Sequence, residues 1–147
     1  MSQIHPFPHH YSVFSTNQPD SEVMIAGEGL PTIASLPPEQ FGGPGDHWSP
    51  ETLLLGALSS CFALTFRAIA RHRGLEWLDL RCQVDGVLER EQGDSRFTQY
   101  QLTASLTIPS HSDVALAEQV LSKAKSGCLI SSSLNGAVEL RTDISVE

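Results

Sequence analysis

The chain has 147 residues, enough for one domain with a hydrophobic core. Seventeen Asp and Glu residues against nine Lys and Arg give a formal net charge of −8, which argues against a nucleic-acid partner and against binding to anionic membranes. Its three cysteines are too few and too scattered for a secreted disulfide scaffold, and no CxxC or CxxxH spacing indicates zinc. We therefore predict a single domain, residues 1–147, without a metal site.

Localisation is predicted from two segments. Residues 1–12 contain no apolar run of signal-peptide length. The longest uncharged apolar run, residues 53–66, is too short to span a bilayer and is interrupted by Gly56, Ser59 and Ser60. We expect a soluble, cytoplasmic protein that does not enter a membrane.

The N-terminal third is predicted to contain two short strands and a long loop. Residues 10–16 and 21–26 have strand composition, and a turn at residues 17–20 separates them. Residues 30–47 are rich in Pro and Gly, so we expect an irregular loop. Loops of this length in a compact domain often carry function.

A long helix is predicted over residues 50–73. Ser49 suits the N-cap, Pro50 suits the first helical position, and Gly74 suits a left-handed C-cap. Over residues 53–66 the sequence is apolar on nearly every side, as is typical of a helix buried all round. One small domain can hardly cover such a helix, so we predict a homodimer in which a second subunit packs over it.

The rest of the chain predicts strands and one more long helix. Residues 76–89 and 97–108 alternate apolar and polar side chains, which favours an antiparallel hairpin around a Gly93–Asp94 turn. A helix should begin after Ser112 as N-cap and stop at Gly127, and a last alternating strand covers residues 138–146. The fold class is α+β, with antiparallel strands on one side and helices covering one face.

The three cysteines have different surroundings. Cys82 lies on the apolar side of a predicted strand, where a small core residue is the ordinary explanation. Cys61 lies in the middle of the predicted buried helix. Cys128 follows Gly127 where a new helical turn can start, and a thiol at a helix N-terminus has a lowered pKa. Core packing is the ordinary explanation for Cys61 or Cys128 alone, but the two together are candidates for redox chemistry.

Glu51 lies ten residues before Cys61 on the same predicted helix. Helix geometry turns the two side chains about 80° apart and separates them by about 15 Å along the axis. They cannot touch within one straight helix, and the local explanation for Glu51 is a residue that complements the helix dipole. They converge only if a substrate, a loop or a partner subunit closes the gap.

The segment GGPGDHWSPETLLLGALSSCF, followed by a hairpin, a helix and a second Cys before ISSSL, resembles the OsmC/Ohr family. The resemblance covers essentially the whole chain and is most specific over residues 42–66 and 127–134. Family members are thiol-dependent peroxidases that reduce organic hydroperoxides. The resemblance implies an intertwined α+β homodimer, with antiparallel sheets packed around long buried central helices and two active sites at the subunit interface.

The resemblance also implies residue roles. Cys61 matches the peroxidatic cysteine, Cys128 the resolving cysteine, and Glu51 the glutamate of the active site. The expected cycle passes through a Cys61 sulfenic acid and a Cys61–Cys128 disulfide, which a dithiol reduces. In the family that dithiol is typically a lipoyl group on a protein. No metal, haem or flavin is needed, so no cofactor is expected.

This chain departs from the family pattern at two points. Strongly active members carry an arginine near the N-terminus, whereas here the first arginine is Arg67. The candidate substitute cation is His47, whose ordinary explanation is a solvated loop residue. Many members also have Cys-Pro where this chain has Cys128–Leu129.

Two alternatives to a peroxidase therefore stay open. One is an OsmC-like protein that binds an apolar or thiol-reactive ligand with little turnover. The other is a redox sensor that passes the disulfide signal to a partner. The histidines near the N-terminus could be taken for a metal site, but an exposed terminus explains them better. These histidines are His5, His9 and His10.

Overall fold

The computed structural model describes residues 4–147, so the first three residues of the predicted domain lie outside the described part. The chain forms two compact units, one ending at Leu53 and one running from Leu54 to Glu147. The long helix α1 begins in the first unit and continues into the second.

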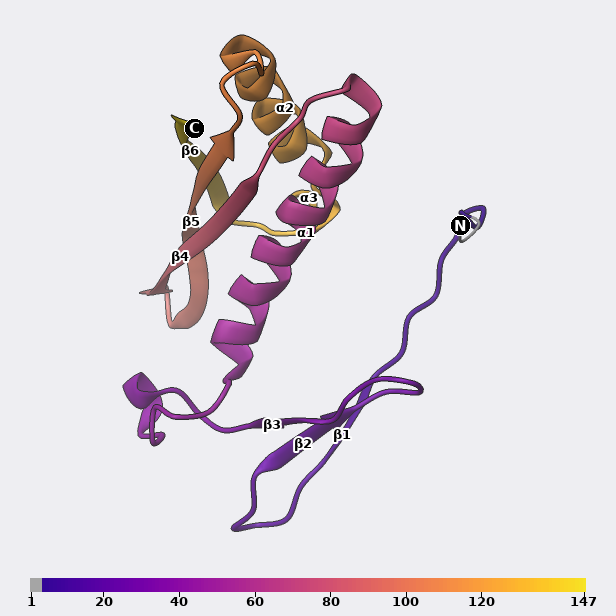
Figure 1. The fold of residues 1–147 in the computed structure, drawn as a ribbon. Coiled ribbons are helices and arrows are strands. Elements are labelled where there is room, and N and C mark those ends of the chain that lie inside the picture. Colours follow the sequence, from indigo (N-terminus) through magenta and orange to yellow (C-terminus); the bar gives the residue numbers. More distant parts are fainter. Residues whose placement is uncertain (1–3) are drawn as a thin grey trace. The chain divides into compact units, whose positions relative to one another are not determined.

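The N-terminal unit contains a three-stranded antiparallel sheet in the order β1-β2-β3 (Figure 1). Its strands are β1 (Phe14–Thr16), β2 (Val23–Ala26) and β3 (Ile33–Ser35), and a 3₁₀ turn, η1 (Glu39–Phe41), follows. The two predicted strands are present but begin later than expected. The prediction of an irregular loop over residues 30–47 is wrong in part, because β3 and η1 lie within it. A three-residue strand between two prolines is too short to show an alternating pattern.

Helix α1 spans Pro50–Arg73, as predicted. At its start, the Ser49 hydroxyl accepts a hydrogen bond from the Thr52 N–H at 3.1 Å, and the Ser49 N–H donates to the Thr52 hydroxyl at 2.9 Å. This reciprocal pair satisfies two backbone donors that the first turn would otherwise leave free. At the other end, Gly74 has φ +70°, which confirms the left-handed C-cap.

The C-terminal unit is built on a sheet of three long strands in the order β4-β5-β6. β4 (Asp79–Glu91) and β5 (Asp94–Ile108) form the predicted antiparallel hairpin. The two turn residues are Gln92 and Gly93, with φ values of 51° and 87°, so the predicted turn is displaced by one residue. Positive φ at both central positions is the geometry that two-residue hairpins favour.

The last strand, β6 (Ala137–Val146), corrects the prediction of a wholly antiparallel sheet. It pairs with β5 in parallel, with Tyr100 opposite Val138 and Leu106 opposite Ile144. Apolar alternation identifies the buried face of a strand but not its direction. Direction follows from the connection, because a helical crossover between two neighbouring strands returns the chain to the same end of the sheet.

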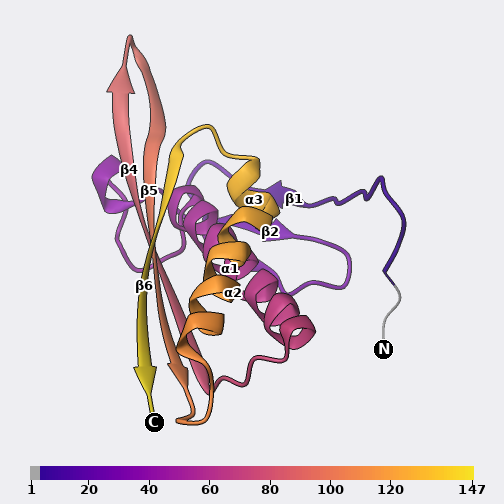
Figure 2. The ribbon, with the colours of Figure 1, turned by 90° about the horizontal axis from the view of Figure 1, so that it is seen from above.

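That crossover consists of α2 (Val114–Gly127) and the short α3 (Leu129–Ser132). The N-cap of α2 is Asp113 rather than the predicted Ser112, since the Asp113 carboxylate accepts from two backbone N–H groups of the first turn. Ser112 instead donates to the Glu76 carbonyl oxygen at 2.9 Å. Figure 2 shows α1 and α2 on the same side of the β4-β5-β6 sheet.

The core of the C-terminal unit lies between that sheet and the helices. From α1 it receives one stripe of fully buried side chains: Leu58, Phe62, Phe66 and Ala70. On the opposite side of the helix Leu64 is 56% exposed, so α1 is buried all round only if a second subunit covers that side, as the sequence prediction assumed. The predicted homodimer, which would cover that side, stays a prediction.

The full length of α1 also changes one expectation about membranes. The uncharged apolar run covers only residues 53–66, but the complete 24-residue helix is long and apolar enough, by length and composition, to cross a bilayer. One such helix is weak evidence for a membrane protein, since core helices pass the same test. In the single chain 22% of that apolar window is buried, and the buried side chains belong to the core of the C-terminal unit.

Candidate functional thiol pair

The structure brings Cys61 and Cys128 together in the C-terminal unit. Cys61 lies in the middle of α1, and Cys128 lies between the end of α2 and the start of α3. The two side chains are close enough for each to shift the pKa of the other, and both are free thiols. Cys128 is 1% exposed, whereas Cys61 is only partly buried. An oxidant would therefore reach Cys61 before Cys128.

The surroundings of Cys61 favour its thiolate. Partial burial raises the pKa of Cys61, but hydrogen bonds from the Ile130 backbone and from the Cys128 thiol outweigh it. The Leu129 backbone acts in the same direction, and the pKa of Cys61 lies below its ordinary value of 9.0. The Thr65 hydroxyl also lies within reach, but its single proton is donated to the Cys61 carbonyl oxygen at 2.7 Å. Thr65 can therefore support the thiolate only by turning away from that carbonyl.

The surroundings of Cys128 favour its protonated thiol instead. Burial raises the pKa of Cys128, and the neighbouring Cys61 sulfur raises it further, while the Ser131 backbone lowers it only in part. The third cysteine stands apart on β4, where burial raises the pKa of Cys82 to about 11. Of the three, Cys61 is thus the thiol most readily ionised and Cys82 is the inert one.

An open hollow of about 550 Å³ lies beside Cys61. Apolar residues from α1 and α3 line most of it. Among them Leu64 is 56% exposed and Leu129 is 67% exposed. The full lining comprises Ala57, Ser60, Cys61, Leu64, Thr65, Ala68, Leu129 and Ile130. A thiol of lowered pKa therefore opens onto an apolar surface.

Glu51 belongs to the N-terminal unit and lines a separate, larger pocket of that unit. Its Oε1 atom is buried and has no hydrogen-bond partner among residues 4–147. The role of Glu51 in an active site shared with the thiols stays a prediction. The unpaired oxygen is a feature that sequence reasoning missed, since nothing in the pattern Pro50–Glu51 separates a capping carboxylate from a buried one.

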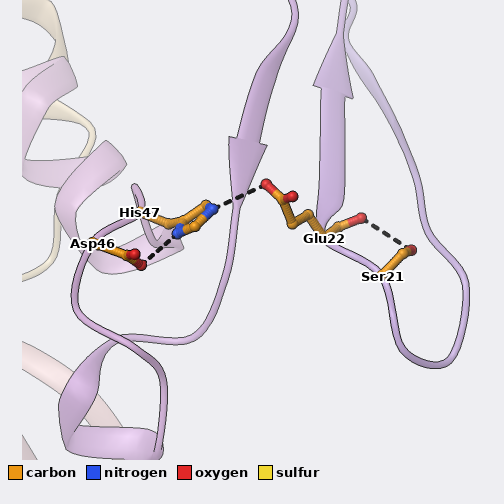
Figure 3. Close-up of polar contacts among 4 residues, drawn as sticks. All are labelled: Ser21, Glu22, Asp46 and His47. Atoms are coloured by element: carbon orange, nitrogen blue, oxygen red, sulfur yellow. Dashed lines mark hydrogen bonds and ion pairs between the residues drawn. The ribbon is translucent and has the colours of Figure 1, made fainter.

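His47, the candidate substitute cation, lies between two other carboxylates (Figure 3). Its Nδ1 contacts Asp46 at 2.6 Å and its Nε2 contacts Glu22 at 3.0 Å. Hydrogen bonding to Asp46 raises the pKa of His47 and lowers the pKa of Asp46. Both ring nitrogens of His47 already contact a carboxylate, so the ring would have to leave one of them to pair with Glu51. The predicted role of His47 as the substitute cation stays untested. The sequence did not predict the contact between His47 and Glu22, because the two residues lie 25 positions apart.

The candidate metal site at the N-terminal histidines can be compared with the structure. Within residues 4–147, the structure brings no three His, Cys, Asp or Glu side chains into a group that could hold a metal ion. Near the N-terminus, the His9 ring contacts the Phe7 ring and the His5 carbonyl oxygen. Residues 4–20 are exposed along their whole length.

Comparisons with known proteins agree on one family. A family model described as OsmC-like protein matches residues 43–143. The uncharacterized protein YmaD of Bacillus subtilis is 34% identical over 126 residues, which cover 84% of this chain and 83% of that protein.

Solved structures show the same fold. An OsmC-like protein of unknown function from Vibrio cholerae matches with a TM-score of 0.80 at 21% identity, over 92% of this chain and 99% of that one. An organic hydroperoxide resistance protein, OsmC, from Legionella pneumophila matches with a TM-score of 0.72 at 20% identity, over 94% of this chain and 99% of that one. The chain therefore belongs to the OsmC/Ohr family and has its α+β fold.

Proposed function

We propose that the protein is a thiol peroxidase that reduces organic hydroperoxides, with Cys61 as the reacting thiol and Cys128 as the resolving thiol. The observation that carries the proposal is the asymmetry of the pair. Cys61 is the more accessible thiol and its pKa is lowered, whereas Cys128 is buried and its pKa is raised. The family resemblance and the name of the Legionella relative support the same chemistry.

In the first step, the Cys61 thiolate attacks the distal oxygen of the hydroperoxide. The O–O bond breaks, the alkoxide takes up a proton and leaves as the alcohol, and Cys61 becomes a sulfenic acid. The apolar hollow beside Cys61 suits an alkyl or lipid chain better than hydrogen peroxide. Glu51 is proposed as a further member of this active site on the strength of the family pattern alone.

In the second step, the Cys128 sulfur attacks the Cys61 sulfur. The S–O bond breaks, the hydroxyl leaves with the Cys128 proton as water, and a disulfide forms. The attack is supported by the closeness of the two side chains, each of which shifts the pKa of the other. An external dithiol, for which a lipoylated protein is the family precedent, then reduces the disulfide by two exchange reactions and is itself oxidised.

The test is consumption of cumene hydroperoxide with dihydrolipoamide as reductant. Cys61→Ser should abolish turnover. Cys128→Ser should accumulate a Cys61 sulfenic acid that dimedone traps and mass spectrometry detects. Cys82→Ser is the matched control and should keep wild-type turnover, because Cys82 lies on β4 outside the pair. A wild-type protein with reduced thiols that fails to turn over would refute the proposal and leave ligand binding or redox sensing.

A further inference from the structure

Thr65 lies one helical turn after Cys61 on α1, and the two residues line the same apolar hollow. Residues four apart in a helix share one face, and the Thr65 Oγ1 atom lies 2.7 Å from the Cys61 carbonyl oxygen. We propose that Thr65 is a positioning residue for the peroxidase reaction, whose hydroxyl turns its proton to the Cys61 sulfur when Cys61 ionises and holds the thiolate in place for attack. The inference rests on the proposed role of Cys61 as the reacting thiol.

The packing of Thr65 keeps its oxygen beside Cys61. Its Cγ2 methyl group faces Gly127 at the end of α2, where a Cβ atom added to that glycine would lie 3.5 Å from the methyl carbon. A β-branched side chain in a helix has few accessible χ1 rotamers. Because the methyl group faces α2 and the oxygen faces the Cys61 carbonyl, only the hydroxyl proton has to move to reach the sulfur.

The single proton of the Thr65 hydroxyl has two acceptors to serve. In the thiol form of Cys61 it is donated to the Cys61 carbonyl oxygen. That carbonyl also accepts the helical bond from the Thr65 backbone N–H, so it keeps a partner when the hydroxyl turns away. A hydrogen bond to a charged acceptor is roughly twice as strong as one between neutral groups. Ionisation of Cys61 therefore favours donation to the sulfur.

Neutral donors stabilise the Cys61 thiolate in this hollow. Among the described residues that line it there is no Lys, Arg or His. Partial burial raises the pKa of Cys61, and the groups that lower it are the Ile130 backbone, the Cys128 thiol, the Thr65 hydroxyl and the Leu129 backbone. Cys128, between α2 and α3, is the titratable group among them, and its own pKa is raised, so it stays a neutral donor when Cys61 ionises. A neutral hydroxyl on α1 therefore has a measurable share in the reactivity of Cys61.

The test is the pH profile of Cys61 alkylation by iodoacetamide in the full chain, read by peptide mass spectrometry with no hydroperoxide present. Thr65→Val keeps the size and the β-branching of the side chain but removes the hydroxyl. At neutral pH it should react at least about threefold more slowly than the wild type, as expected for the loss of one hydrogen bond of ordinary strength. Its profile should move to higher pH. Where Cys61 is fully ionised the variant should be at least as fast as the wild type, because nucleophilicity rises with thiol pKa.

Two further variants separate the hydroxyl from the packing of the side chain. Thr65→Ser keeps the hydroxyl and should give a profile close to that of the wild type. Thr142→Val removes the hydroxyl of an exposed threonine on β6, outside the hollow, and is the matched control that should behave as the wild type does. If circular dichroism shows Thr65→Val to be unfolded, Thr65→Ala removes the hydroxyl without adding bulk and should show the same shift.

Two results would overturn the inference. In the first, the profile of the folded variant without the hydroxyl coincides with that of the wild type. In the second, alkylation slows by the same factor at every pH and Thr65→Ser does not restore it, which is the result of a merely structural role. Because labelling needs no hydroperoxide, its outcome is distinct from that of turnover. A shifted profile in a chain without turnover removes only the proposed peroxidase, and an unshifted profile in an active peroxidase removes only the role of Thr65.

Discussion

Cys61 and Cys128 have pKa values shifted in opposite directions, and each side chain contributes to the shift of the other. Burial raises the pKa of Cys61, but the Ile130 backbone, the Cys128 thiol and the Leu129 backbone lower it by more. Burial raises the pKa of Cys128, and the Cys61 sulfur raises it further. In this pair Cys61 is the thiol that ionises more readily, and Cys128 is the thiol that stays protonated.

We first predict that iodoacetamide modifies Cys61 ahead of the other thiols at neutral pH, as read by peptide mass spectrometry. Cys128→Ala removes a side chain that lowers the pKa of Cys61, so the pH profile for Cys61 alkylation should move to higher pH. Cys128→Ser keeps a hydroxyl donor and should move the profile less. Cys82 should stay unmodified, because its pKa is raised to about 11. Earlier labelling of Cys128 or Cys82 would contradict the assignment of roles.

The second prediction concerns pH and His47. Its pKa is raised in the folded chain, so its contacts contribute stability that is fully present below the ordinary value of 6.5 and is lost as pH rises through the raised pKa. Asp46, whose pKa is lowered from 3.8, contributes stability that is present above 3.8 and is lost as pH falls through the lowered pKa. The His47–Asp46 pair should therefore stabilise the fold most between about pH 4 and 6.5.

Thermal unfolding as a function of pH checks this prediction. His47→Gln should flatten the fall in melting temperature above pH 6.5, while His72→Gln, at the C-terminal end of α1, serves as the matched control. The effect should be small, because the side chains of Glu22 and Asp46 are 47% and 71% exposed. An unchanged slope in His47→Gln would show that the contact does not persist in solution.

Elements with local capping residues or a long alternating pattern were predicted well from the sequence, whereas a choice decided by tertiary contacts was not. The prediction of a helix from about residue 50 to 73 matches α1, because Ser49 and Gly74 mark its ends with capping chemistry that is local. The face of β5 was also predicted correctly, since Tyr100 to Ile108 alternate over many residues. The N-cap of α2 was displaced by one residue, because Ser112 and Asp113 are equally good caps and only tertiary contact with Glu76 separates them.

For the candidate site too, some features were predicted from the sequence and others appear only in the structure. Cys61 and Cys128 were named from the family pattern, and the structure brings them together. The unpaired oxygen of Glu51 and the ring contacts of His47 were not foreseen. Both depend on segments far apart in the chain, and no period or motif in one sequence records which carboxylate a histidine will meet.

The third prediction tests the turn that walls the Glu51 pocket. A Cβ added at Gly43 would lie 1.6 Å from the Pro37 carbonyl oxygen, a backbone atom that cannot move freely. Gly43→Ala should therefore lower the free energy of unfolding, by about 1–3 kcal/mol in urea denaturation. Gly127→Ala is the matched control, since its Cβ would meet only Thr65 Cγ2 at 3.5 Å and alanine favours the helix. Equal stability of the two variants would show that the turn can relax around a methyl group.

The last prediction concerns the second subunit. Leu64 on α1 and Leu129 on α3 are 56% and 67% exposed around the hollow beside Cys61, and adjoining exposed leucines of this size indicate a surface that another chain covers. We expect the wild type to be a dimer by sedimentation equilibrium and Leu64→Glu to be a folded monomer, because burying an unpaired carboxylate at the interface is unfavourable. Leu78→Glu is the matched control, since Leu78 is 55% exposed in the same unit but outside α1 and that hollow. A monomeric wild type, or a Leu64→Glu variant that dimerises as strongly as the wild type, would rule out this surface as the dimer interface.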